Sequence, residues 1–117
     1  ATMKSKLNYP DTKCLKEEGE AKDYINIEIL KPELCNRYVG RIVTNIKIEQ
    51  SPWWLQKRLM YAGMRPINNI VDITNYVMLE YGQPIHAFDI RDLEDSRIIV
   101  DTAKEGEIFT TLVGPER

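Results

Sequence analysis

His86 and Asn75 are the two side chains of this sequence whose types and settings best suit chemistry at neutral pH. His86 is the only histidine, and imidazole is the side chain that most readily accepts or donates a proton near pH 7. Asn75 lies inside a helical pattern, where asparagine is a poor choice unless its amide has a hydrogen-bonding task. Each residue also has a structural interpretation: His86 holding a turn, and Asn75 facing solvent or bonding to a neighbouring element. The residue types alone leave both interpretations open.

Asp89 follows His86 by three residues, so in an extended segment the two side chains point to opposite faces. A His–Asp couple therefore requires a bend, and the simpler interpretation is that Asp89 caps the next turn. Asp72 and Thr74 are also expected to be structural.

Several other kinds of chemistry have no support in the sequence. It contains no G-x-S-x-G, no glycine-rich phosphate loop and no H-E-x-x-H. Cys14 and Cys35 have no neighbouring histidine, so a Cys–His nucleophile and a common four-ligand zinc site are not expected. The expected compartment is a reducing cytoplasm with both thiols free, and neither a metal nor a cofactor site is predicted.

Composition predicts a soluble globular domain. The 117 residues are 43% hydrophobic and 29% charged, with a net charge of −2. A strongly basic nucleic-acid binder is disfavoured at this charge. No apolar run approaches the length of a membrane helix, so no membrane partner is expected.

The chain changes character near residue 24. Residues 1–23 are rich in charge of both signs and lack apolar periodicity, which predicts a linker or a disordered arm. Alternation over residues 25–29 and again over 38–48 predicts two half-buried strands, the second bent at Gly40. Residues 24–117 are expected to form the folded part.

Two helices are predicted next. Ser51 suits the N-cap of the first, Pro52 its first helical position and Gly63 its C′ position, with Leu55 and Leu59 on the buried face. The second begins at Asn68 or Asn69 and ends at Gly82 and Pro84. Its buried stripe is expected to contain Ile70, Ile73, Val77 and Tyr81.

The remaining segments are strand-like. Residues 98–100 and 108–113 are apolar, and Glu105-Gly106 between them predicts a hairpin turn. The order strand, strand, helix, helix, strand, strand predicts an α+β domain with a mainly antiparallel β-sheet and two central helices.

The first helix carries an aromatic pair and a basic pair. Trp53-Trp54 could stack on nucleic-acid bases, but at the start of an amphipathic helix the pair is more typical of the core and its rim. Lys57-Arg58 is expected to be a solvated face.

A long motif gives the sequence a family resemblance. Residues 51–63, the block Arg65-Pro66-Ile67-Asn68-Asn69-Ile70-Val71-Asp72-Ile73-Thr74-Asn75-Tyr76-Val77-Met78-Leu79-Glu80, and Gly82-Gln83-Pro84-Ile85-His86-Ala87-Phe88-Asp89 closely resemble bacterial phenylalanine–tRNA ligase beta subunits. Residues 33–38, 106–107 and 111–117 also resemble this family. The resemblance covers residues 24–117 and falls at the start of the editing domain, made from the third and fourth modules of the subunit.

The resemblance implies a function for the longer protein. Such a ligase attaches phenylalanine to its tRNA, with ATP and Mg used in a synthetic site on the alpha subunit of a heterotetramer. An apolar pocket rejects the extra hydroxyl of tyrosine only weakly, so a second site that hydrolyses tyrosyl-tRNA is needed. By resemblance, Asn75 would hydrogen-bond the substrate, and His86 would position the 3′ end of tRNA(Phe) or the attacking water.

The family's editing domain continues beyond residue 117, so this chain is expected to be a fragment with little or no deacylase activity alone. Strands left unpaired in such a fragment predict a homodimer. The alternative is a non-catalytic structural module, or one that binds an aromatic amino acid.

Overall fold

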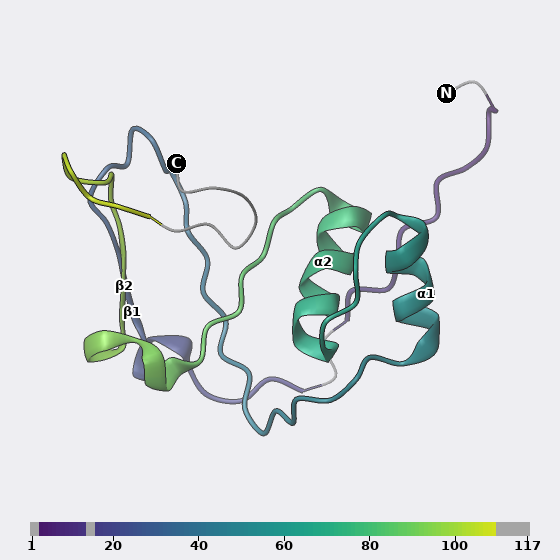
Figure 1. The fold of residues 1–117 in the computed structure, drawn as a ribbon, viewed down its shortest axis with the longest axis horizontal. Coiled ribbons are helices and arrows are strands. Elements are labelled where there is room, and N and C mark those ends of the chain that lie inside the picture. Colours follow the sequence, from purple (N-terminus) through teal and green to yellow (C-terminus); the bar gives the residue numbers. More distant parts are fainter. Residues whose placement is uncertain (1–2, 14–15, 110–117) are drawn as a thin grey trace.

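The computed structural model describes residues 3–13 and 16–109. Its helices are α1 (Trp53–Tyr61) and α2 (Asn69–Tyr81), and its strands are β1 (Asn26–Ile29) and β2 (Arg97–Val100). Three short 3-10 turns complete the order, η1 (Ala21–Asp23), η2 (Ile90–Asp92) and η3 (Glu94–Ser96). The two strands lie together at one side of the molecule and the two helices at the other (Figure 1).

The sheet is parallel, which corrects the expected antiparallel architecture. β1 and β2 pair in register from Asn26 with Arg97 to Ile29 with Val100, and Arg97 forms an ion pair with Glu28 at 2.8 Å. Parallel strands require a long crossover between them, and here the crossover contains both helices. The prediction failed because alternation shows which face of a strand is buried but does not identify its partner.

The strand expected over residues 38–48 does not form. That segment has no ladder, and Asn45 has a left-handed φ of 57°, which interrupts an extended conformation. The turn expected at Glu105-Gly106 is present, with Gly106 at φ 83° and Glu107 N donating to Lys104 O at 3.0 Å. Ile108 and Phe109 are not in a strand, and the rest of the expected strand 108–113 lies outside the described residues.

Both helices form where the sequence predicts them, with one correction at the start of α1. Pro52 is the N-cap, and Ser51 uses its hydroxyl elsewhere. At the other end Gly63 N donates to Met60 O at 3.0 Å and Met64 N to Leu59 O at 2.9 Å, the two bonds of a Schellman motif. The predicted C′ position of Gly63, at φ 83°, is therefore confirmed.

The second helix begins and ends as expected but buries a different residue. Asn68 is its N-cap and accepts from Val71 N, and Gly82 ends it at φ 75°. The expected stripe is not buried, since Ile73 and Tyr81 remain about half exposed. The buried side chain of α2 is Asp72.

The buried core of the described residues is small. Leu55 and Leu59 are its apolar members, and Ser51 and Asp72 are its polar ones. The core thus lies where α1 contacts α2, and the two-stranded sheet adds none of the fully buried side chains.

Candidate functional site

Asp72 connects the starts of the two helices. Its side chain is 1% exposed, and its carboxylate accepts from Ser51 Oγ at 2.5 Å and from Ile67 N at 2.8 Å. A buried carboxylate with two hydrogen bonds fixes the residues that donate to it. The structural role expected for Asp72 is confirmed.

Two adjacent asparagines hold the start of α2. Asn68 caps the helix, with its Oδ1 3.0 Å from Val71 N. Asn69 joins the helix to the preceding segment: its Nδ2 donates to Lys47 O at 2.9 Å, and its backbone N donates to Glu49 O at 2.8 Å. Thr74 also has a local role, because its hydroxyl donates to Val71 O. Much of the 65–80 motif therefore positions α2.

Asn75 and His86 lie on either side of the end of α2. Asn75 is half-buried within the helix, and His86 is exposed in the segment that follows Gly82. The His86 ring lies 4.6 Å from the Phe88 ring, centroid to centroid, at a tilt of 59°. Within the described residues, no hydrogen bond or ring contact joins Asn75 to His86. Their roles as substrate-binding residues, and that of His86 in catalysis, stay predictions.

The Asp89 carboxylate hydrogen-bonds and ion-pairs with Arg91, not with His86. Its carboxylate accepts from Arg91 N at the start of η2 and pairs with the Arg91 guanidinium at 2.6 Å. The hydrogen bonds from the side chain and backbone of Arg91 lower the pKa of Asp89 to about 2. The prediction that Asp89 caps the next turn is confirmed.

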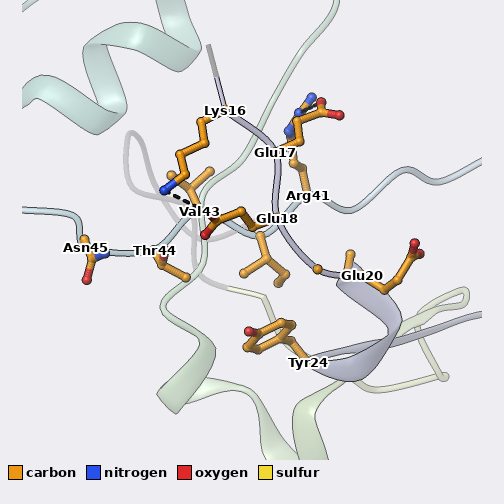
Figure 2. Close-up of a pocket in the computed structure, with 12 residues that line it drawn as sticks. Lys16, Glu17, Glu18, Glu20, Tyr24, Arg41, Val43, Thr44 and Asn45 are labelled. Atoms are coloured by element: carbon orange, nitrogen blue, oxygen red, sulfur yellow. Dashed lines mark hydrogen bonds and ion pairs between the residues drawn. The ribbon is translucent and has the colours of Figure 1, made fainter. Parts of the chain in front are cut away.

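A surface hollow of about 560 Å³ lies between the segment before η1 and residues 41–45. Figure 2 shows charged side chains around it, with Lys16 and Glu18 paired at 2.8 Å. Arg41 pairs with Glu17 across the same hollow. Asn75 and His86 do not line it, so it is separate from the residues singled out by sequence.

The structure reveals an aromatic and cationic cluster that the sequence interpretation missed. The Arg58 guanidinium lies 5.5 Å from the Trp54 ring centroid and 5.8 Å from that of Tyr76, and it donates to the Tyr76 hydroxyl. Trp53 and Trp54 are 66% and 54% exposed, so the expectation that they form core and rim is wrong. The available signal was the spacing of Trp54 and Arg58, four residues apart on one helix face.

Residues 3–13 and 16–109 contain neither a metal-binding cluster nor a membrane-spanning helix. No group of three or more His, Cys, Asp or Glu side chains there is arranged to hold a metal ion. No helix in this part of the chain has the length and apolarity needed to span a membrane. Cys35 is a free thiol, and Cys14 lies outside the described residues.

Comparison with known families identifies the class of domain. The model of the B3/4 domain family matches residues 34–117. This match covers most of the chain, including both helices, strand β2, Asn75 and His86, and β1 lies before its first residue. The chain belongs to the B3/4 domain family.

Three individual relatives of the chain all belong to one kind of subunit. The chain is 51% identical over 112 residues to the phenylalanine–tRNA ligase beta subunit of Clostridium acetobutylicum, which covers 96% of this chain and 14% of that protein. The corresponding subunit of Carboxydothermus hydrogenoformans is 58% identical over 93 residues, 80% of this chain and 12% of the relative. That of Symbiobacterium thermophilum is 52% identical over 118 residues, 100% of this chain and 13% of the relative.

These matches confirm the resemblance to phenylalanine–tRNA ligase beta subunits. The Symbiobacterium match also includes residues 1–23, which the resemblance stated from sequence leaves out. The chain spans about one seventh of the length of the relatives it matches most extensively.

Proposed function

We propose that this domain serves a phenylalanine–tRNA ligase by contributing Asn75 and His86 to a site that hydrolyses mischarged tyrosyl-tRNA(Phe). The observation that carries the proposal is the match of about half of all residues, over nearly the whole chain, to beta subunits of that ligase. The partners proposed with it are the 3′ end of tRNA(Phe) and the ligase alpha subunit.

The geometry gives defined positions to Asn75, in the middle of α2, and to the segment after Gly82 that carries His86. Hydrogen bonds of Asp72 and Asn69 hold the start of this helix against neighbouring segments. The location of Asn75 relative to those segments is therefore fixed. Gly82 then turns the chain in a left-handed conformation, and His86 follows with its imidazole exposed. An exposed imidazole is accessible to a substrate that arrives from solution.

The proposed reaction is hydrolysis of an ester. The oxygen of a water molecule attacks the tyrosyl carbonyl carbon, the bond from that carbon to the ribose oxygen breaks, and the ribose hydroxyl regains a proton. Tyrosine is released with a carboxyl group. His86 would hold the water or the terminal ribose, while the Asn75 amide would hydrogen-bond the substrate.

A chimera tests the proposal. The matched segment of the Clostridium acetobutylicum subunit is replaced by this chain, and the assembled ligase is given tyrosyl-tRNA(Phe), with phenylalanyl-tRNA(Phe) as the control substrate. We expect selective release of tyrosine, lowered at least tenfold by His86→Ala or Asn75→Ala, with attachment of phenylalanine unchanged.

The matched control is Gln83→Ala, in the same exposed segment as His86. It should leave the release of tyrosine within about twofold of the unaltered chimera. If the natural Clostridium ligase releases tyrosine and the two site variants release it equally fast, the proposed roles of Asn75 and His86 are wrong. This chain by itself is expected to show little or no deacylase activity.

A second candidate is a non-catalytic packing module. It is favoured by the exposure of large apolar side chains, such as Phe88 at 52% and Ile85 at 49%, in the same segment as His86. Under this alternative, Phe88→Asp in the chimera would impair assembly with the alpha subunit, while His86→Ala would leave both assembly and hydrolysis intact.

A further inference from the structure

His86 and Phe88 form a pair of rings in the segment that follows α2. Their centroids lie 4.6 Å apart and the ring planes are tilted by 59°. Aromatic rings attract one another at this separation when their faces are not stacked directly. Residues 83–89 form neither helix nor turn, and in an extended backbone side chains two residues apart lie on the same side. The spacing of the two residues therefore favours the contact.

The Phe88 ring is the neighbour that orients the imidazole. Within the part of the chain that the structure describes, no hydrogen bond or ion pair joins the His86 ring, and its one aromatic contact is with Phe88. A functional histidine is commonly oriented by a carboxylate or carbonyl on one ring nitrogen. Asp89 does not do this, because Arg91 engages its carboxylate. Contact with a phenyl ring leaves both imidazole nitrogens available to a substrate or a water.

The backbone is held on both sides of the ring pair. Gly82 N donates to Met78 O at 2.7 Å, which fixes the direction in which the chain leaves α2. Asp89 comes directly after Phe88 and is the N-cap of η2, with its carboxylate 2.6 Å from the Arg91 guanidinium. Phe88 thus has a defined place from which it can restrict its neighbour.

We propose that Phe88 is a positioning residue that holds the His86 imidazole in the orientation needed for hydrolysis of the tyrosyl ester. This inference rests on the proposed function and extends it to a residue that acts only through His86. Without the phenyl ring, the imidazole would be divided among roughly three χ1 wells and two χ2 orientations. The share of molecules in the productive orientation would then fall about threefold to sixfold.

Phe88→Leu in the chimera that carries this chain tests the proposal, because leucine stays apolar but lacks the ring. We expect kcat for tyrosine release to fall about threefold to sixfold, with KM and the attachment of phenylalanine unchanged. Phe88→Tyr retains the ring and should release tyrosine at nearly the unaltered rate. The matched control is Ile85→Ala, since Ile85 is 49% exposed and Phe88 is 52% exposed in the same segment. It should also leave the rate nearly unaltered.

A double variant separates positioning from a purely structural role. Once the imidazole is removed, a residue that acts through it has nothing left to position. The variant that combines His86→Ala with Phe88→Leu should therefore release tyrosine no more slowly than His86→Ala alone. Additive losses in the two single variants would overturn the proposal, because they would show that Phe88 acts independently of His86.

Proton NMR of the 117-residue chain tests the contact without any reaction. His86 is the only histidine, so its imidazole C–H signals are readily assigned, and the ring current of a neighbouring phenyl group displaces them. Phe88→Leu should shift these signals, whereas Ile85→Ala should leave them in place. Signals that stay in place in Phe88→Leu would overturn the proposal.

His86→Ala in the same chimera distinguishes this inference from the proposed function. If His86→Ala slows the release of tyrosine and Phe88→Leu does not, His86 keeps its role and positioning by Phe88 is wrong. If neither variant slows release, the proposed role of His86 is wrong, and positioning by Phe88 is wrong with it.

Discussion

Asp72 is a buried carboxylate whose hydrogen bonds hold the fold together. It lies in the same motif as Asn75, and the sequence predicts a structural role for it. The structure shows both oxygens engaged with donors from other segments and the side chain sealed from solvent. A carboxylate with these partners stabilises the packing of α1 against α2.

We predict that Asp72→Ala lowers the free energy of unfolding by about 3 kcal/mol, because the Ser51 hydroxyl and the Ile67 amide lose their acceptor inside the protein. Urea unfolding followed by far-ultraviolet circular dichroism measures the loss. Ser51→Ala removes one of the two bonds and should cost about 1 kcal/mol. The control is Glu80→Ala on exposed α2 surface, which should stay within about 0.5 kcal/mol; an equally small change for Asp72→Ala would refute the assigned role.

Asp89 gives a prediction on pH dependence. Its carboxyl has a lowered pKa of about 2, against an ordinary value of 3.8, because hydrogen bonds from Arg91 favour the charged form. The contribution of this pair to the turn is therefore complete above pH 3.8 and is lost as pH falls through about 2. An NMR titration of the Asp89 carboxyl should give a midpoint near 2, and Arg91→Gln should move it upward. An unchanged midpoint in that variant would contradict the assigned cause.

Residue roles were predictable from sequence only where a local bond defines them. Asp89 and Asn68 cap turns a few residues away, and such caps depend on short-range spacing alone. The cluster around Arg58 needed the packing of α1 against α2, because Tyr76 belongs to the second helix. The exposure of Trp54 likewise depends on what surrounds the helix, which its own sequence does not specify.

At the scale of elements, helices were predictable and strand pairing was not. A helix satisfies its backbone groups internally, so the capping residues and the apolar spacing mark α1 and α2 within a few residues. A strand satisfies its groups only with a partner. Residues 38–48 alternate as a strand should, yet no partner in the described residues pairs with them. β1 instead pairs with β2, far along the chain.

Gly63 allows a test of the glycine that marks the end of α1 in the sequence. It has φ 83°, and a Cβ at this position would meet no atom within 4 Å, so a substitution is opposed by backbone conformation alone. We predict that Gly63→Ala lowers the free energy of unfolding by about 1–2 kcal/mol. Gly63→Asn should cost less, because asparagine tolerates the left-handed region better. Equal losses for the two variants in urea unfolding would show that the Schellman turn is not what stabilises this end of α1.

The whole molecule is more open than a domain of its length. Its radius of gyration is 17.6 Å, whereas the usual scaling gives about 13 Å for 117 residues. The helix pair and the strand pair lie on opposite sides of the molecule, joined by long segments without regular structure (Figure 1). Many large apolar side chains of the described residues therefore face solvent.

The open sheet leads to a prediction of self-association. Within the described residues β1 and β2 form a sheet of two strands, so each leaves one backbone edge unpaired, and such edges pair with other chains. Sedimentation should show a mass that rises from 13.6 kDa toward twice that value with concentration. Ile99→Lys, on half-exposed β2, should weaken association about tenfold because an edge lysine opposes strand pairing. Ile108→Lys is the matched control, since Ile108 is 81% exposed and lies outside the sheet. A single monomeric mass at every concentration, or equal effects of the two lysines, would show that the sheet edge is not the contact.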